Sequence, residues 1–317
     1  MKTYEMSDEE KEFLAGYDLT KYDRPSVAAD VVVFSVMKDD ECEDVRRLQE
    51  KKLKILLIRR GGFPYKGSWA MPGGFCRKGE DVIDSARREL CEETGIDDAY
   101  VKLVGVYGEP DRDPRGWVIS STYMALMNGR DCRLKAGDDA QDARWFTVEL
   151  TDVSTEVTEA AEVSGIGVEI VKNEVEASHE VQNVKRYRLV LKNADSDIKL
   201  TAVLRRTDMS SCERSSDSYD IEECEGLAFD HARIITEAVL GLREDVRRDM
   251  ELAFDLLPER FTLTELQNVY EQIWDMELTT PNFRRKIAEY VEETDAYQSG
   301  ERYRPAKLFM RRKDARK

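Results

Sequence analysis

Three glutamates near residue 90 have a spacing that could assemble a metal site. Glu89 and Glu93 are four residues apart and Glu92 lies three residues after Glu89, so on a helix the three carboxylates share one surface. Carboxylates crowded in this way repel one another unless a cation lies among them. Hard divalent ions such as Mg²⁺ or Mn²⁺ prefer oxygen ligands, and Mg²⁺ takes further ligands from substrate phosphate and water. The cluster therefore predicts a Mg²⁺ or Mn²⁺ site for phosphate chemistry; the alternative is a helix face that only meets solvent.

The neighbouring residues could position this cluster. Val82, Ala86 and Leu90 recur every four residues, which predicts an amphipathic helix over about 82–94 with a buried apolar face. A loop rich in glycine and proline precedes the helix at 61–74.

Four residues could join that loop to the helix. Arg88 can pair with Glu80 and so orient the loop relative to the helix. Gly73 and Gly74 allow the backbone to approach a metal, where a carbonyl could add a ligand. We assign that carbonyl to Gly74 and a substrate contact to Gly73.

Residues 74–96 resemble the Nudix box. They match every required position of the pattern G-x5-E-x7-R-E-U-x-E-E-x-G-U, in which U is a bulky aliphatic residue. The resemblance implies a pyrophosphohydrolase that cleaves a nucleoside diphosphate linked to another group, with metals that neutralise the pyrophosphate and help to deprotonate water. It also implies catalytic roles for Glu80, Arg88, Glu89, Glu92 and Glu93, of which the last three are metal ligands. A Nudix fold that has lost its activity is the alternative, and the general base is not identified.

The resemblance extends beyond the box. Residues 63–75, 108–117, 136–140, 143–146 and 227–231 resemble ADP-ribose pyrophosphatase-like proteins and, together with 261–286, the Nudix-related transcriptional regulators of NAD metabolism. This implies a Nudix domain that senses ADP-ribose-type ligands, a winged helix that binds DNA, and a homodimer. Many such regulators have a degenerate box, whereas the box here is intact, which favours catalysis.

Two arginines in one of these segments could bind the ligand. The fork of an arginine suits phosphate oxygens, so Arg112 and Arg115 are candidate substrate-binding residues. The alternative is a structural turn built on the Asp-Pro and Arg-Gly pairs around them. For His231, capping or hydrogen bonding in the core is favoured over catalysis.

Strand-like runs surround the predicted helix and indicate an α+β fold, an α/β/α Nudix sandwich with a mixed sheet. These runs are 27–37, 53–58, 101–108, 118–127 and 143–148. We divide the chain into an N-terminal extension (1–25), a Nudix domain (26–150 with 226–248), an acidic β-rich insertion (151–225) and a winged-helix domain (249–317).

The proposed insertion differs in composition from the residues before it. It has 17 acidic against nine basic residues, which is half of the chain's net charge of −16. Tyr187, Leu189 and Leu191 alternate with other residues before a turn at 193–197, which predicts a β-hairpin. Residues 210–225 are polar and predict a mobile loop. A lid and a dimer contact both remain open as roles.

The C-terminal residues have the order of a winged helix-turn-helix. Thr262 and Glu265 form a capping box at one helix start. Thr280 and Pro281 mark a second start, with threonine as N-cap and proline at the first helical position. Residues 297–310 predict two short strands.

This C-terminal domain is locally basic. Residues 282–317 carry 11 basic against six acidic residues. The candidate DNA-binding residues are Arg284, Arg285 and Lys286 on the second helix and Arg302 and Arg304 in the hairpin, because phosphate contacts supply most DNA affinity. The alternative is a winged helix used for packing or dimerisation.

Composition limits the class of protein. The chain has 317 residues, enough for two or three domains, and its 65 acidic against 49 basic residues exclude a protein that coats nucleic acid along its whole surface. The six cysteines include no C-x-x-C pair. With no signal peptide or membrane helix in the sequence, we expect a soluble, cytoplasmic protein.

Two functions fit these features. The first is a Mg²⁺-dependent hydrolase that splits ADP-ribose or a similar nucleoside diphosphate derivative. The second is a transcriptional regulator whose Nudix fold binds an ADP-ribose-type ligand without cleaving it and whose winged helix binds double-stranded DNA. The intact set of carboxylates places hydrolysis first.

Overall fold

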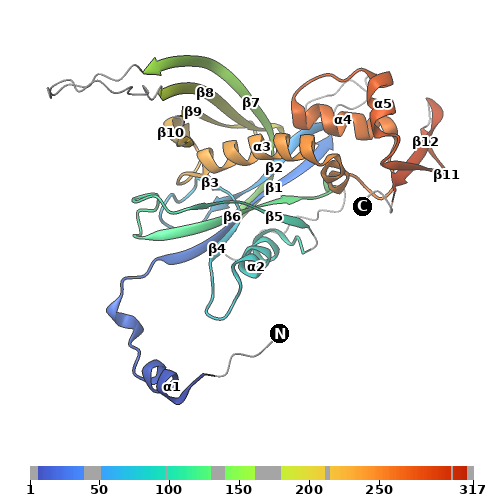
Figure 1. Ribbon diagram of the computed structural model, residues 1–317. Helices are drawn as coiled ribbons and strands as arrows, with labels where there is room; N and C mark the ends of the chain where they lie inside the picture. Colours follow the sequence, from blue (N-terminus) through green and yellow to red (C-terminus); the bar gives the residue numbers. More distant parts are fainter. Residues whose placement is uncertain are drawn as a thin grey trace, which may run out of the picture.

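The computed structural model describes residues 6–38, 51–97, 99–129, 140–160, 180–210, 215–300 and 303–312. A ten-stranded mixed sheet has α2 (Val82–Thr94) packed on one face and α3 (His231–Arg248) on the other, and a smaller unit of helices and two strands follows α3 (Figure 1). The predicted α+β fold class is confirmed, and the helix predicted over 82–94 has the predicted bounds.

The sheet runs in the order β10-β9-β8-β7-β2-β1-β6-β5, with β3 beside β2 and β4 beside β1. Among the strands of the described residues, only β1 and β6 form a parallel pair. The strands are β1 (Ser26–Lys38), β2 (Lys51–Arg60), β3 (Trp69–Ala70), β4 (Gly73–Phe75), β5 (Tyr100–Tyr107), β6 (Val118–Leu126), β7 (Ala140–Ala160), β8 (Glu180–Asn193), β9 (Ile198–Ser210) and β10 (Ser215–Glu225).

The sequence of β1 explains why helices cover both faces. Side chains alternate between the faces of a strand, and β1 is apolar at nearly every position. Val32 and Phe34 belong to the core under α3, whereas Val31 and Val33 belong to the core under α2. Each face must therefore be covered, and the site at α2 and the long helix α3 lie on opposite sides of one sheet.

The segment predicted as an insertion extends this sheet instead of forming a separate unit. The boundary expected at residue 150 falls inside β7, and β8, β9 and β10 add to it in antiparallel order. The predicted hairpin is present, with β8 and β9 joined by a short turn at Ala194–Ser196. The prediction of a loop over 210–225 is wrong for β10, because its backbone pairs with β9 although its side chains are polar.

The C-terminal unit has the predicted winged-helix order of α4 (Leu263–Trp274), α5 (Thr280–Ile287), β11 (Val291–Gly300) and β12 (Tyr303–Arg311). The capping box of Thr262 and Glu265 is present. The second helix begins one residue earlier than predicted, with Thr279 as N-cap, so Thr280 is already helical.

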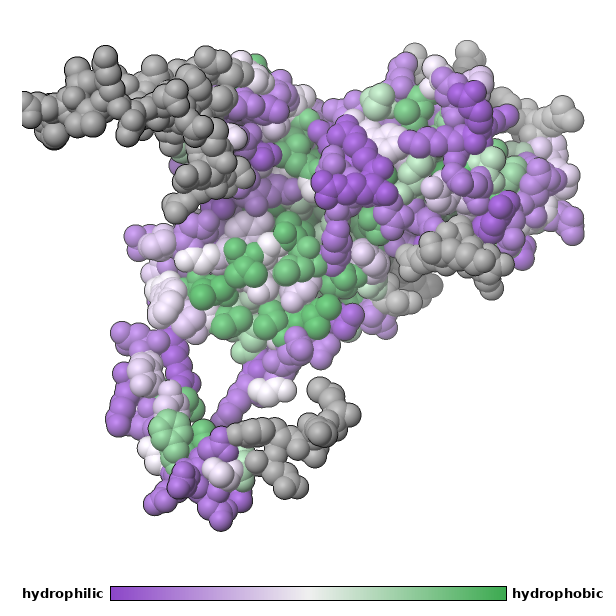
Figure 2. Space-filling view, viewed as in Figure 1, coloured by the Kyte–Doolittle hydropathy of each residue, from purple (hydrophilic) through white to green (hydrophobic). Residues whose placement is uncertain are grey.

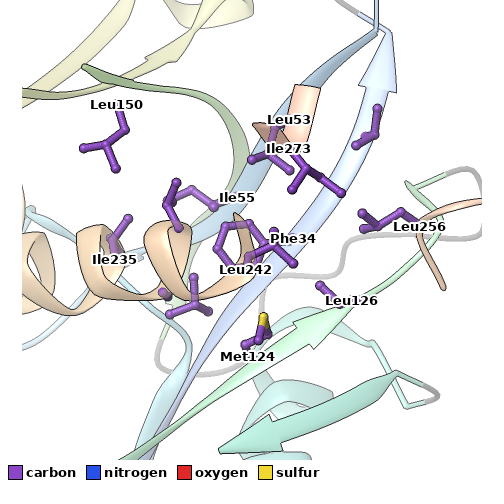
Figure 3. Close-up of a cluster of buried hydrophobic side chains, with 14 of the residues drawn as sticks. Phe34, Leu53, Ile55, Met124, Leu126, Leu150, Ile235, Leu242, Leu256 and Ile273 are labelled. Atoms are coloured by element: carbon purple, nitrogen blue, oxygen red, sulfur yellow. The ribbon is translucent and has the colours of Figure 1, made fainter. Parts of the chain in front are cut away.

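The two units share a single hydrophobic core. Ile273 of α4 and Leu256 of the 3₁₀ helix η4 (Met250–Leu256) lie in one cluster with Phe34 of β1 and Leu242 of α3 (Figure 3). The C-terminal unit is therefore packed on the sheet through α3. Among the described residues, no helix is long and apolar enough to cross a membrane.

Candidate functional site

The loop before α2 meets the helix where two glycines lie in β4. A Cβ atom on Gly74 would come 2.6 Å from the carboxylate carbon of Glu89, and one on Gly73 would come 2.3 Å from Asp30 Oδ1. A side chain at position 73 would also collide with the backbone of Ala29 and Asp30, so only glycine fits there, whereas a side chain at position 74 would displace the Glu89 carboxylate. The backbone N–H of Gly73 donates to Glu93 at 2.8 Å. The backbone thus lies directly against the acidic face of α2.

Glu93 is the buried carboxylate of this corner, with 9% of its surface exposed. The pKa of Glu93 is raised to about 8, mainly by burial and also by the carboxylates of Glu89 and Asp30, while the N–H of Gly73 and the charge of Arg60 act in the opposite direction. The ionised form of Glu93 is therefore unfavourable in this environment. A cation among these oxygens would relieve that cost.

Arg88 binds the other carboxylates of the box. It donates to Glu80 at 2.7 and 3.0 Å, to Glu89 at 2.5 Å and to Glu92 at 3.2 Å. The Arg88 and Ser85 hydrogen bonds lower the pKa of Glu80 to about 2. The pair of Arg88 with Glu80 expected from sequence is present and joins the loop to the helix.

Glu92 forms hydrogen bonds with arginines at the surface and does not lie beside Glu93. Its carboxylate accepts hydrogen bonds from Arg77 and Arg88, and its side chain is 48% exposed. Within the described ranges, no three Asp, Glu, His or Cys side chains are grouped so that they could hold a metal ion. The three glutamates predicted as ligands share the helix but do not converge, because arginines neutralise two of them.

A cavity opens beside Gly73 and Gly74. Its lining includes Asp30, Arg60, Phe75, Arg112, Arg115 and Phe229. Guanidinium groups suit phosphate oxygens, and aromatic rings suit a flat base or sugar face. The cavity therefore offers the groups that a nucleotide-like ligand needs, next to the acidic corner.

Phe229 is the centre of the cavity's aromatic wall. Arg60 lies over its ring at 4.9 Å from the centroid, Arg115 lies at 5.4 Å, and Tyr65 packs against it at 4.7 Å between centroids. Phe229 has a φ of 52°, a left-handed conformation that a bulky residue rarely adopts. The surrounding contacts hold it there, at the residue just before the N-cap of α3.

The two arginines singled out from sequence both line this cavity. Arg112 donates to Asp230 at 2.9 and 2.8 Å, with only 7% of its side chain exposed. Arg115 donates to Asp113 at 2.6 Å and lies over the ring of Phe75 at 4.8 Å. Each arginine thus has a structural ion pair and also faces the cavity, so both alternatives stated for them have support.

His231 has the structural role favoured from sequence. It is 5% exposed, and its Nδ1 accepts a hydrogen bond of 3.0 Å from the backbone N–H of Met71. Burial lowers the pKa of His231 to about 4, so the ring is neutral at pH 7.

Sequence reasoning missed Asp30, Arg60 and Phe229. Asp30 carried a signal, since it is the single charged residue within the apolar run 27–37. Phe229 lies in the segment 227–231 that carries the resemblance, but that segment assigned it no role. Arg60 carried no signal, because its place in the cavity depends on pairing between distant strands.

The basic residues of α5 point away from its packed face. Phe283 and Ile287 are buried, whereas Arg284, Arg285 and Lys286 are exposed. Of the two predicted hairpin residues, Arg302 lies outside the described residues. Arg304 belongs to β12, but its side chain lies outside the described part of the chain.

Comparison with known proteins identifies both units. Residues 44–164 match the NUDIX domain family, and residues 253–310 match the NrtR DNA-binding winged helix domain. The chain is 29% identical over 304 residues to the "ADPR responsive transcriptional repressor NtrR" of Acinetobacter baylyi, which covers 95% of this chain and 87% of the relative. It is 42% identical over 139 residues to the ADP-ribose pyrophosphatase of Methanocaldococcus jannaschii, covering 43% of this chain and 72% of that protein.

Solved structures resemble the whole chain. A MutT/nudix family protein from Enterococcus faecalis is 25% identical, with a TM-score of 0.58 over 98% of this chain and 100% of that one. Shewanella oneidensis NrtR is 22% identical, with a TM-score of 0.54 over 90% and 94% of the two chains, which supports the fold.

The buried neutral His231 predicts a pH-dependent stability. The folded pKa of about 4 lies below the 6.5 of an ordinary histidine, so unfolding takes up a proton between these values. Its contribution is fully present above pH 6.5 and is lost as the pH falls towards 4. The free energy of unfolding should lose about 2 kcal/mol from this residue between pH 7 and pH 5.

The measurement is urea unfolding of the natural protein and of His231→Gln, whose side-chain carbonyl can still accept the Met71 N–H. The stability advantage of histidine over glutamine should shrink from pH 7 to pH 5. An advantage of the same size at both pH values would contradict the assignment.

Proposed function

The chain belongs to the Nudix family, and because its Nudix domain is joined to a winged helix of the NrtR type, we propose that it is a DNA-binding transcriptional regulator that responds to an ADP-ribose-type ligand. The observation that carries this proposal is the similarity along nearly the whole chain to an ADPR responsive repressor. The intact box favoured hydrolysis from sequence, but a pyrophosphatase relative matches the Nudix part alone.

The ligand would occupy the cavity beside Gly73 and Gly74. Arg60 and Arg115 lie on the ring of Phe229, so the wall combines cations for a pyrophosphate with an aromatic face for a base or sugar. Arg112, almost fully buried against Asp230, adds a third cation. This combination supports a nucleoside diphosphate derivative rather than a simple sugar or an apolar ligand.

The carboxylate corner fits a divalent cation such as Mg²⁺ or Mn²⁺. Burial makes the negative charge of Glu93 unfavourable in this structure. The carboxylate of Glu89 lies beside Gly74, and that of Glu93 accepts the N–H of Gly73. Glu89, Glu93 and the backbone carbonyl of Gly74 would hold the ion. Glu92 would join them only if its hydrogen bonds to Arg77 and Arg88 broke. When bound, the ion would neutralise ligand phosphate and activate water.

Helix α3 offers a route from the ligand to the DNA-binding unit. At one end, Asp230 is its N-cap residue and pairs with Arg112 in the cavity. Near the other end, Arg243 donates to the carbonyl of Ile273 at 3.0 Å, and its own carbonyl accepts from Trp274 at 3.2 Å. A ligand phosphate that binds Arg112 would compete with Asp230 and weaken this ion pair. The first turn of α3 could then move, and the contacts of Arg243 with Ile273 and Trp274 would transmit the movement to α4.

Hydrolysis is a second candidate, supported by one observation, the complete carboxylate set of the box with its Arg88–Glu80 link. A regulator that slowly cleaves its own ligand would combine both activities.

DNA binding tests the main proposal. Replacing Arg284 and Arg285 together by alanine removes two exposed cations, so affinity for the protein's own upstream DNA should fall. The slope of log affinity against log salt should become shallower by about 2, since each phosphate contact contributes close to one unit. Adding ADP-ribose should weaken DNA binding by the natural protein.

Gel shifts at several salt concentrations provide the measurement. The control removes two cations from the extended sheet, Arg188→Ala with Arg205→Ala, and should leave the slope unchanged. The proposal would be refuted if all three proteins had the same slope of log affinity against log salt, or if ADP-ribose left the DNA affinity of the natural protein unchanged.

The Arg112–Asp230 pair predicts how the two sites are coupled. Asp230→Asn should weaken the hold on Arg112, so the ratio of DNA affinities without and with saturating ADP-ribose should fall at least about fivefold, within the usual range of coupling energies. The matched control is Asp245→Asn, because Asp245 also lies on α3 and forms an ion pair with Lys102 of β5. If the Asp230→Asn ratio equals that of the natural protein, α3 is not the route.

The hydrolase candidate predicts release of a nucleotide and a sugar phosphate from ADP-ribose with Mg²⁺. Glu93→Gln should reduce turnover by more than about 100-fold, because losing even an outer-shell partner of a metal costs 10–100-fold. Glu149→Gln, on an exposed part of β7, should retain full turnover. Absence of turnover by the natural protein across a nucleotide panel would eliminate hydrolysis and leave the regulator untouched.

A further inference from the structure

A second cavity lies beside the middle of α3, apart from the cavity beside Gly73 and Gly74. Its volume is about 410 Å³, and none of the described residues lines both cavities. The outer strands of the sheet are β10 and β5, yet both contribute to the walls of the second cavity together with α3. The sheet therefore curves around α3, and Figure 1 shows this helix between β10 and the β5–β6 pair.

Helix α3 forms the floor of the second cavity with three residues on one side. Glu237, Gly241 and Asp245 follow one another at intervals of four residues, so they lie along the same side of the helix, and all three line the cavity. The two carboxylates are separated by about 12 Å along the helix axis. The floor thus has a carboxylate at each end and only backbone between them.

The packing of the chain does not require glycine at position 241. A Cβ atom there would meet no atom of a neighbouring element within 4 Å, and the residue has no positive φ. Glycine is the least favourable residue in a helix interior apart from proline. Its presence leaves the backbone of α3 bare inside a cavity, where an alkyl chain could lie directly on it.

The two carboxylates of the floor can each accept a further donor. Asp245 accepts a hydrogen bond of 2.6 Å from Lys102 of β5. Glu237 accepts one of 3.0 Å from the hydroxyl of Tyr107 and one of 2.7 Å from Arg233. A carboxylate has about four lone-pair sites, so neither group is saturated. The Lys102 contact also shows that an ammonium group on an alkyl chain fits at the Asp245 end.

The charge of the lining favours a cation. It includes three acidic residues against two basic ones, Lys102 and Arg206. Arg206 is paired with Asp208 at 2.7 Å and with Asp217 at 3.5 Å, and Lys102 is paired with Asp245. Both basic residues are thus already neutralised by carboxylates. The net charge of −16 on the whole chain adds a long-range attraction for cations.

The walls also suit an apolar chain that bears cations. Leu103 and Val104 of β5 and Met124 of β6 line the cavity beside α3. Figure 2 shows that a broad hydrophobic area continues over the face where Figure 1 places β5 and β6. The ring of Tyr219 in β10 forms part of the opposite wall, and an aromatic face attracts a cation. The cavity therefore combines charged ends with an apolar middle.

We propose that the second cavity binds a linear diamine or polyamine, with one ammonium group at Glu237, another at Asp245 and the methylene chain across Gly241. The distance between the two carboxylates selects the length of the ligand, because a short diamine reaches only one of them and a long one must bend. Lys102 can share Asp245 or turn outwards, since its side chain is 40% exposed. The proposal rests on neither DNA binding nor ADP-ribose binding.

Calorimetry with a series of terminal diamines, from diaminopropane to diaminooctane, tests the contact at two ends. The full-length natural protein should bind one diamine per chain, and the affinity should peak within the series. The monoamine with as many carbons as the best diamine should bind at least about tenfold more weakly, because a hydrogen bond between charged groups is lost.

Two variants and a matched control locate the bound diamine. Gly241→Leu should reduce the affinity below detection, because its side chain would occupy the open floor, and leucine favours the helix. Asp245→Asn should weaken binding by about tenfold or more. Glu244→Gln removes the same charge from the same helix, but Glu244 pairs with Arg247 and Arg248 outside the cavity, so the affinity should not change. Circular dichroism shows that each variant is folded.

Three results would overturn the proposal. One is the absence of binding by every diamine of the series. Another is an affinity that neither peaks with length nor exceeds that of the monoamine, which would mean that only one end is recognised. The third is an equal loss for Asp245→Asn and Glu244→Gln, or full affinity in Gly241→Leu, which would mean that diamines follow the net charge of the chain. DNA binding and the response to ADP-ribose are unaffected by any of these results.

Discussion

The burial of Glu93 against Gly73 is the constraint on which the rest of the site depends. A carboxylate in an apolar surrounding is costly unless it is hydrogen-bonded or neutralised. Here the N–H of Gly73 supplies the hydrogen bond, and it can do so only because glycine lets the loop lie against α2. The position of β4 against α2 depends on this close approach. Arg88 performs the same neutralising role for the outer carboxylates.

Helix α3 imposes a second constraint because it belongs to both units. Its first turn lines the cavity beside Gly73 and Gly74, where His231 accepts the Met71 N–H, and its last turns lie in the core shared with α4. A closely packed core has low compressibility, so a displacement at one end of such a helix is transmitted to the other end. A winged helix on a flexible linker would be insulated from the ligand, whereas this one shares apolar contacts with the sheet that forms the cavity.

Local signals predicted most elements but not their assembly. The spacing of Val82, Ala86 and Leu90 defined α2, and the capping box at Thr262 defined the start of α4, because both depend on neighbours within one turn. The partner of Arg112 is 118 residues away in Asp230, and no local pattern reports such a pair. The boundary expected at residue 150 falls inside β7 for a similar reason. The residues of a strand indicate that it is a strand, but its neighbours in the sheet, here β2 and β8, depend on the rest of the chain.

An intact carboxylate set does not by itself distinguish a sensor from a hydrolase. A sensor needs affinity for the ligand in its ground state, whereas a hydrolase needs interactions that strengthen only in the transition state. The arginines on Phe229, and a cation held by Glu89 and Glu93, would serve ground-state binding of a pyrophosphate, so a sensor would have reason to keep them. Hydrolysis needs in addition a base that deprotonates water. Glu80 is poorly suited to this task, because hydrogen bonds from Arg88 and Ser85 occupy its oxygens and lower its pKa to about 2, which makes it a weak base. The same box can therefore be retained for recognition, with the speed of cleavage setting only how long the ligand signal lasts.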